Sequence, residues 1–254
     1  VGATANVMMA AVLAKGITTI RDAACEPEIV DLANFLNKMG AQVSGGGTAT
    51  VTIHGVEELH GTNYAVIPDR IEAGTFMIAG AVTNGDIFIN NAIPTHMEAL
   101  AEKLCQIGVQ LDWQEKGVHI TTPNPLIPAD VGTDVYPGFP TDMQAQIMGL
   151  MALTPGMSVI TESIFPDRFM HVSELNRMGA KILIDGDSAV IHGVNSLSGA
   201  PVMASDLRAG AVLILAGMAA KGETVISRVY HIDRGYEKIE KKLTNIGADI
   251  VRQK

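Results

Sequence analysis

The sequence predicts an α/β fold assembled from four copies of one helix–strand–helix–strand unit. In each copy an apolar, alanine-rich helical run ends at a glycine, a strand-like segment follows, and an amphipathic helix ends at a second glycine. Successive first glycines are 69, 71 and 66 residues apart, so the repeat defines equivalent positions. Both sets fall where helix ends need a residue that tolerates positive φ. The first set is Gly16, Gly85, Gly156 and Gly222, and the second is Gly40, Gly108, Gly179 and Gly247.

Taken in order, each copy gives a helix, a strand, and a second helix that leads into another strand. The predicted ranges are 3–16, 17–24 and 26–43; 70–85, 86–93 and 94–111; 142–156, 157–164 and 165–184; and 208–222, 223–230 and 231–251. Further strands are expected between the copies, as at 49–54 and 189–193. The helix after Asp142 is apolar on nearly every face, so we expect it to be buried.

Charge and composition exclude several classes of partner. The net charge of −9 and the lack of an extended basic patch argue against nucleic acid or an anionic membrane surface. The two cysteines form neither a disulfide framework nor a zinc spacing, and the apolar run 209–220 is too short to span a bilayer. We therefore expect a cytoplasmic protein with no metal and no other cofactor. Because the chain enters a helix-like run without an initiator methionine, we also expect it to begin in mid-protein.

The strongest candidate for chemistry is Asp142, which a loop with two prolines delivers to the start of the apolar helix. An aspartate at this place has two explanations. It can cap the helix, since Asp is a favoured N-cap residue, or it can be a catalytic carboxylate in the positive field of the helix N-terminus. The sequence alone leaves both open.

Four arginines stand near predicted helix starts, although the helix dipole favours acidic residues there. They are Arg70, Arg168, Arg208 and Arg234, and each follows an aspartate by one or two residues. One explanation is a set of structural salt bridges between repeat units with Asp167, Asp206 and Asp233. The other is a cluster of guanidinium groups that binds phosphate or carboxylate groups in a shared cleft.

Four segments make the sequence similar to a known family. They are "PGFPTDMQAQ", "FPDRFMHVSELNRMGA", "SDLRAGAVLILAGMAAKGET" and "RVYHIDRGYEKIEKKLTNIGADI". These segments closely resemble the UDP-N-acetylglucosamine 1-carboxyvinyltransferases, the enolpyruvyl transferases that open bacterial peptidoglycan synthesis. The resemblance implies an EPSP synthase-like inverse α/β barrel fold of six repeats, three per domain. The chain would hold the last four, with 1–67 the remainder of the first domain and 68–254 the second.

The resemblance also implies roles for individual residues. Asp142 would act as the general base on the sugar 3′-hydroxyl, and Arg234 would engage phosphoenolpyruvate. Asp206, Arg208 and Arg168 match further active-site positions. The uridine nucleotide sugar would be held by Val1, Gly2, Thr141, Asp142, Ile164 and Phe165. No metal is implied, and the substrates are UDP-N-acetylglucosamine and phosphoenolpyruvate.

The family's N-terminal part, with a Lys-Asn pair for phosphoenolpyruvate and a loop that carries the proton donor, does not match these residues. The resemblance therefore predicts that the chain alone is inactive, and that the missing segment is either a separate chain or the rest of the same protein. Two other functions stay open. One is the related 3-phosphoshikimate 1-carboxyvinyltransferase, and the other is a non-catalytic paralogue that binds a sugar nucleotide.

Overall fold

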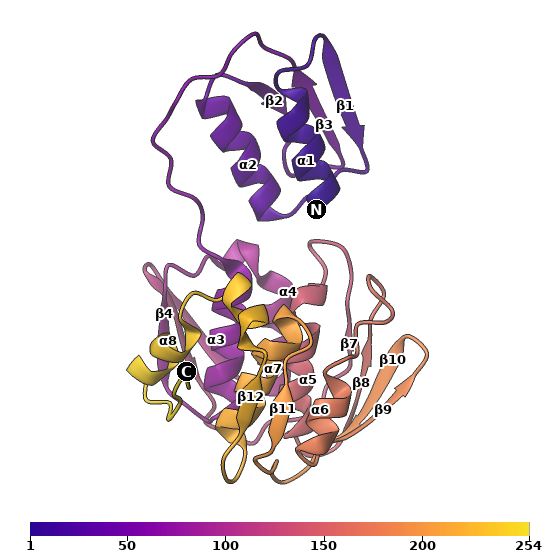
Figure 1. Ribbon diagram of the computed structural model, residues 1–254, viewed down its shortest axis with the longest axis vertical. Coiled ribbons are helices and arrows are strands. Elements are labelled where there is room, and N and C mark those ends of the chain that lie inside the picture. The colour runs from indigo at the N-terminus through magenta and orange to yellow at the C-terminus, as the bar shows by residue number, and fades with distance from the viewer. Residues whose placement is uncertain (254) are drawn as a thin grey trace. The chain divides into compact units, whose positions relative to one another are not determined.

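The computed structural model describes residues 1–253, which divide into two compact units (Figure 1). Unit 1 comprises Val1–Pro68, and unit 2 begins at Asp69. Helices and strands are present in both units, so the predicted α/β class is confirmed. Within residues 1–253, no helix combines the length and apolar character that crossing a membrane would require.

Unit 1 is one copy of the repeat. Its elements are α1 (Gly2–Ala11), β1 (Ile17–Arg21), α2 (Pro27–Lys38), β2 (Gln42–Ser44) and β3 (Thr50–His54). The strands form an antiparallel sheet in the order β1-β3-β2. One face of each helix packs on this sheet, and the buried side chains include Met8, Ile29 and Ile53. By contrast, Val7 and Met9 of α1 remain about half exposed, at 45% and 47%.

Unit 2 contains the other three copies. The helices are α3 (Arg70–Val82), η1 (Pro94–His96), α4 (Glu98–Ile107), η2 (Thr141–Met143), α5 (Gln144–Ala152), α6 (Val172–Arg177), α7 (Leu207–Ala219), η3 (Val229–Arg234) and α8 (Ile239–Asn245). The strands are β4 (Ile87–Asn90), β5 (Gln110–Gln114), β6 (Gly117–Thr121), β7 (Val131–Gly132), β8 (Met157–Thr161), β9 (Lys181–Asp185), β10 (Ser188–His192), β11 (Pro201–Met203) and β12 (Val225–Ser227).

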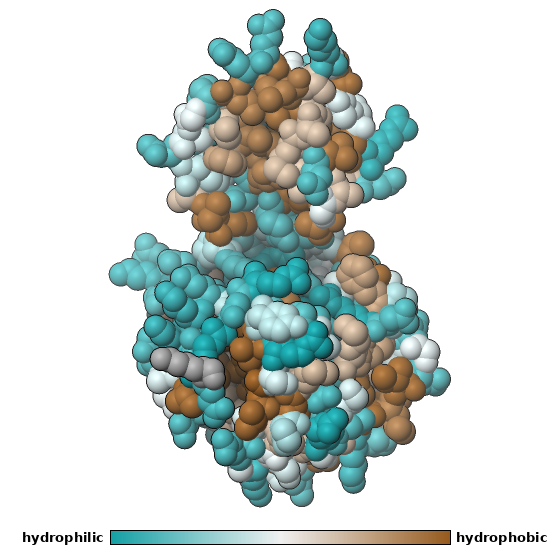
Figure 2. Space-filling view, viewed as in Figure 1, coloured by the Kyte–Doolittle hydropathy of each residue, from teal (hydrophilic) through white to brown (hydrophobic). Residues whose placement is uncertain are grey.

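The sheets repeat one topology. The order β4-β6-β5 recurs in the larger sheet as β8-β10-β9, where β7 adds a parallel strand at the edge. The last copy pairs only β11 with β12, in parallel. Beside this short sheet, α7, β12 and α8 line a cavity of about 540 Å³, and Figure 2 shows hydrophobic atoms around a hollow on this face.

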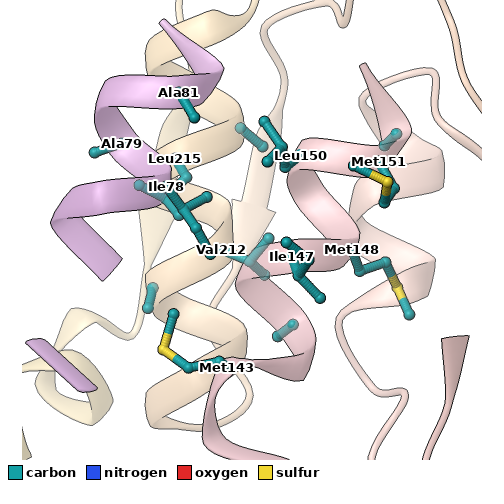
Figure 3. Packing of buried hydrophobic residues seen from close by; sticks show 14 of the residues in the cluster. Ile78, Ala79, Ala81, Met143, Ile147, Met148, Leu150, Met151, Val212 and Leu215 are labelled. Carbon is teal, nitrogen blue, oxygen red and sulfur yellow. The ribbon is translucent and has the colours of Figure 1, made fainter. Parts of the chain in front are cut away.

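The centre of unit 2 is helical. The first helix of each copy, α3, α5 and α7, contacts the other two, and their side chains interdigitate in Figure 3. All nine residues of α5 are buried, which confirms the expected buried helix. Burial of a large aliphatic side chain stabilises a fold by roughly 1.5–3 kcal/mol. The packing of α3, α5 and α7 on one another therefore holds the N-terminal ends of these helices in fixed positions.

The helix ends follow the predicted glycines with one difference. Seven of the eight glycines have positive φ, but in the second copy Asn84 (φ 52°) adopts this conformation instead of Gly85. Asparagine tolerates the left-handed region better than other residues with a side chain. The predicted helix within 165–184 begins only at Val172, because the preceding residues form a turn whose backbone N–H groups at Ile164 and Phe165 bond to Glu162.

Candidate active site

Asp142 lies in η2, directly before α5, and it does not cap that helix. The N-cap of α5 is Met143, and no side chain bonds to its first N–H groups. Instead, the Asp142 carboxylate lies between two guanidinium groups. Its Oδ1 is 2.8 Å from Nη2 of Arg168, and its Oδ2 is 3.0 Å from Nη2 of Arg208. The capping interpretation is therefore wrong, and the carboxylate belongs to a three-residue ionic cluster.

Arg208 reaches this cluster from the first turn of α7. Asp206 caps the helix, since its Oδ1 accepts the backbone N–H groups of Arg208 at 2.7 Å and Ala209 at 2.9 Å. The guanidinium donates from Nη1 to the Tyr236 hydroxyl at 3.1 Å and lies 5.8 Å from the centre of that ring. The side chain is only 14% exposed. Asp206 thus acts on the helix backbone and does not pair with the Arg208 side chain.

Arg168 approaches from the turn between β8 and α6. Its Nη1 donates to Oγ1 of Thr141 at 3.0 Å, and its guanidinium lies 5.5 Å from the centre of the Phe165 ring. Arg168 and Arg208 both contact Asp142 rather than Asp167 or Asp206. Asp233 pairs with Arg252 at 2.6 Å. For these residues the expected salt bridges between repeat units are therefore wrong.

The electrostatics of the cluster favour an ionised Asp142. Burial alone would raise the pKa of this carboxyl group. The hydrogen bond and positive charge of Arg208 lower it, and the charge of Arg168 lowers it further. Together the two arginines outweigh burial, so the pKa lies below its usual value. Two guanidinium groups around one carboxylate leave one surplus positive charge. Such a site attracts anionic ligands and offers an ionised carboxylate beside them.

A buried polar network below the cluster was not predicted from the sequence. The hydroxyl of Tyr236, which is fully buried, lies 2.8 Å from Oγ1 of Thr75 and 3.4 Å from Nε2 of Gln146. These residues come from α3 and α5, so with Arg208 of α7 the hydroxyl joins all three central helices. Two glutamines in an otherwise apolar helix, Gln144 and Gln146, are the sequence signal that could have indicated a buried polar site.

Other predicted site residues lie elsewhere. Arg234 is exposed at the end of η3, and within the described residues no hydrogen bond or ion pair joins it to Asp142. Val1 and Gly2 lie at the start of α1 in unit 1, whereas the other predicted site residues belong to unit 2. Ile164 and Phe165 form the turn after β8, and their backbone N–H groups point to Glu162. Among residues 1–253 there is no group of three or more His, Cys, Asp or Glu that could hold a metal ion.

Comparison with known proteins relates this geometry to a family. A family model described as EPSP synthase (3-phosphoshikimate 1-carboxyvinyltransferase) matches residues 1–243. The chain is 56% identical over 254 residues to UDP-N-acetylglucosamine 1-carboxyvinyltransferase 2 of Carboxydothermus hydrogenoformans, and 54% identical over 251 residues to UDP-N-acetylglucosamine 1-carboxyvinyltransferase of Myxococcus xanthus. Each alignment includes 99% of this chain, which spans 61% and 60% of the lengths of these relatives.

Solved structures agree on the fold. The enolpyruvyl transferase NikO from Streptomyces tendae superposes with a TM-score of 0.86 at 28% identity, over 98% of this chain and 59% of that one. EPSP synthase from Acinetobacter baumannii gives 0.70 at 21% identity, over 97% of this chain and 60% of that one, and at this identity the likeness concerns the fold alone. The predicted EPSP synthase-like fold is thereby confirmed, with the central helices and peripheral sheets described above. Because the family model matches residues 1–243 of the 254 in this chain, the chain belongs to the EPSP synthase family.

Proposed function

We propose that these residues are part of an enzyme that transfers the enolpyruvyl group of phosphoenolpyruvate to the 3′-hydroxyl of UDP-N-acetylglucosamine and releases phosphate. The observation that carries the proposal is the Asp142 carboxylate held between Arg168 and Arg208 at the start of a buried helix. The choice of acceptor is supported by the names of relatives that are 54–56% identical. Such a reaction would belong to peptidoglycan synthesis in the cytoplasm.

The reaction requires three tasks of the protein. A proton must leave the sugar hydroxyl as its oxygen bonds to C2 of phosphoenolpyruvate, and a proton must be added to the C3 methylene group. The C3 proton is then lost as the bond from C2 to the phosphate oxygen breaks, which restores the double bond. Asp142, which is ionised, would accept the hydroxyl proton. In this proposal the group that protonates C3 lies outside these residues.

The arginines suit the anionic parts of both substrates. Phosphoenolpyruvate carries a phosphate and a carboxylate, and guanidinium groups bind both by paired hydrogen bonds. The surplus positive charge of the cluster would stabilise phosphate as it leaves. Arg234, which is exposed, would contact phosphoenolpyruvate after a movement of the surrounding segment. Thr141, Ile164, Phe165, Val1 and Gly2 are proposed to hold the nucleotide sugar.

We further propose that activity needs two repeats that precede the four described above. In this proposal residues 1–67 complete the first domain together with those repeats, and 68–254 form the second. The apolar side chains of α1 that remain exposed support this idea, because the equivalent helices α3, α5 and α7 are buried by one another. The four repeats alone are then expected to bind substrate weakly and to release no phosphate.

The direct test is an assay of the full-length protein that contains these residues. Phosphate release is measured with phosphoenolpyruvate and either UDP-N-acetylglucosamine or shikimate 3-phosphate, and calorimetry measures the binding of each acceptor. We expect turnover and binding with the sugar nucleotide only. The description of the family model makes 3-phosphoshikimate transfer the second candidate, and turnover with shikimate 3-phosphate alone would establish it. Binding of the sugar nucleotide without any turnover would indicate the non-catalytic paralogue.

A further inference from the structure

Glu162 is a buried acidic residue that none of the roles above includes. It follows the last residue of β8, and its side chain is completely buried, with 0% exposure. Its backbone N–H donates to the carbonyl of Asp187 at 2.8 Å, which fixes the start of the turn that leads to Arg168. A buried carboxylate is costly unless it is well compensated, so its partners indicate what it is for.

All four partners of this carboxylate are hydrogen-bond donors. Oε1 accepts the Thr133 hydroxyl at 2.8 Å and the backbone N–H groups of Ile164 at 2.9 Å and Phe165 at 3.0 Å. Oε2 accepts the Thr141 hydroxyl at 2.8 Å. Within residues 1–253 no lysine or arginine is bonded to it directly. The charge is therefore balanced by oriented dipoles rather than by an ion pair.

The Thr141 hydroxyl connects Glu162 to the ionic cluster. A carboxylate oxygen only accepts, so the proton of Thr141 must point to Glu162. The lone pairs of the same oxygen are then free to accept Nη1 of Arg168 at 3.0 Å. The other end of that guanidinium, Nη2, contacts Asp142 at 2.8 Å. Glu162 thus binds the proton of Thr141 and leaves the lone pairs of the same oxygen to Arg168.

We propose that Glu162 is a positioning residue of the transferase site, which acts through Thr141 to hold Arg168 against Asp142 and fixes the backbone of Ile164 and Phe165. The assignment rests on the function proposed above. Glu162 contacts three residues of the proposed site, Thr141, Ile164 and Phe165, and its complete burial keeps it from contact with substrate.

Replacement by glutamine tests this role with a minimal change of shape. An amide has one accepting oxygen and one NH₂ group that only donates. Three donors surround the position of Oε1, so in Glu162→Gln the amide oxygen is favoured at that position. The NH₂ group would then take the place of Oε2 and face Thr141. The Thr141 hydroxyl must then accept from this NH₂ group, so its hydrogen bond to the charged carboxylate is lost and its oxygen is shared between the amide and Nη1 of Arg168. Loss of one hydrogen bond to a charged group predicts a decrease in kcat/KM of about tenfold to a hundredfold.

The experiment is a double-mutant cycle in the full-length protein, with Glu162→Gln, Thr141→Val and the combination. Because both changes act on the same link through Thr141 to Arg168, Glu162→Gln should lower kcat/KM by less than about threefold once Thr141 is valine. A merely structural role would make the two effects independent. Thr133→Val is the matched control, since it removes a hydroxyl donor from the same carboxylate without touching Arg168. It should lower the melting temperature and leave kcat/KM within about threefold.

Independent effects in the cycle, or full activity of Glu162→Gln, would overturn the assignment while the proposed function stands. An inactive wild-type protein would overturn both. If Glu162→Gln does not fold, the comparison of Thr141→Ser with Thr141→Val decides. Serine keeps the hydroxyl link, so Thr141→Ser should be at least about tenfold more active than Thr141→Val. Equal activity of these two variants would show that the link does not operate.

Discussion

Helices α5 and α7 begin differently, although they occupy equivalent places in the repeat. At α7, Oδ1 of Asp206 accepts two backbone N–H groups, at 2.7 and 2.9 Å, and serves as a cap. At α5, no side chain caps the helix, and both oxygens of Asp142 face arginines. The comparison shows that an aspartate near a helix start is available for chemistry only where the backbone does not use it.

The repeat explains how this difference arose in the sequence. Arg70, Asp142 and Arg208 each lie fourteen residues before the positive-φ residue that follows their helix, which is Asn84, Gly156 or Gly222. Asp142 thus replaces an arginine, and Pro140 stands where Asp206 caps α7. The third copy thus has a carboxylate where its neighbours have a guanidinium, and no aspartate at the position of Asp206. A salt bridge between copies, from Asp142 to Arg208, follows from that exchange.

The largest effect is expected from Asp142→Asn in the full-length protein. Asparagine keeps the shape of the side chain but cannot accept the hydroxyl proton, so kcat should fall by about a hundredfold to ten-thousandfold. Binding of UDP-N-acetylglucosamine, measured by calorimetry, should change little. The control is Asp86→Asn, which alters an exposed aspartate that contacts His119. Unchanged turnover of Asp142→Asn would remove Asp142 from the mechanism.

Arg208→Lys comes next, since it separates charge from geometry. Lysine keeps the positive charge but cannot contact Asp142 and Tyr236 together as the guanidinium does. We expect kcat/KM to fall by about tenfold to a hundredfold. Arg177→Lys provides the matched control, because Arg177 is 59% exposed and, among residues 1–253, pairs only with Glu174. Similar kinetics for the two variants would mean that charge alone is sufficient at the start of α7.

His171 faces residues of both helix starts, Asp206 near α7 and Arg168 near Asp142. Complete burial lowers the pKa of His171 to about 4, with Arg168 adding to the decrease and Asp206 opposing it. The unfolded chain therefore binds this proton more tightly than the folded one, and stability is lost as the pH falls from 6.5 towards 4. Between pH 7 and 5 the wild type should lose about 2 kcal/mol more than His171→Leu.

Urea unfolding of both proteins at pH 7 and pH 5 measures this difference. At pH 7 the histidine is neutral in both states, so the variant reports only the packing change there. Equal losses of stability in the two proteins on acidification would show that His171 is protonated normally in the fold.

The smallest effect concerns the cap of α7. Asp206→Ala should lower the free energy of unfolding by about 1 kcal/mol, since the first N–H groups lose their acceptor. Asp206→Asn should restore most of it, because asparagine caps almost as well. Urea unfolding distinguishes the two variants. If Asp206→Asn keeps its stability but loses kcat, Asp206 has a direct role in the reaction. The contrast with Asp142 would then be weaker.

The repeat, the helix and strand types and the burial of α5 could be predicted from the amino-acid sequence, because these features depend on local periodicity and on residues that tolerate positive φ. The sequence also placed Asp142 and four arginines near predicted helix starts, and the structure brings two of these arginines, Arg168 and Arg208, to Asp142. The ends of the helices and strands were harder to predict from the sequence. The turn before α6 depends on Glu162, and its partners Thr133 and Thr141 are distant in sequence.

The partners of the charged residues could not be predicted in this way, because they depend on the packing of the repeats. Asp142 could not be distinguished from a cap by its neighbours in sequence, since the alternative partners lie 26 and 66 residues away. The roles of Tyr236 and Glu162 likewise come from contacts between helices and turns that no local pattern encodes. The atoms joined by a hydrogen bond or a close ion pair lie about 3 Å apart. Their partners are therefore set by how the repeats pack, whereas the helices and strands are set by the order of residues within each repeat.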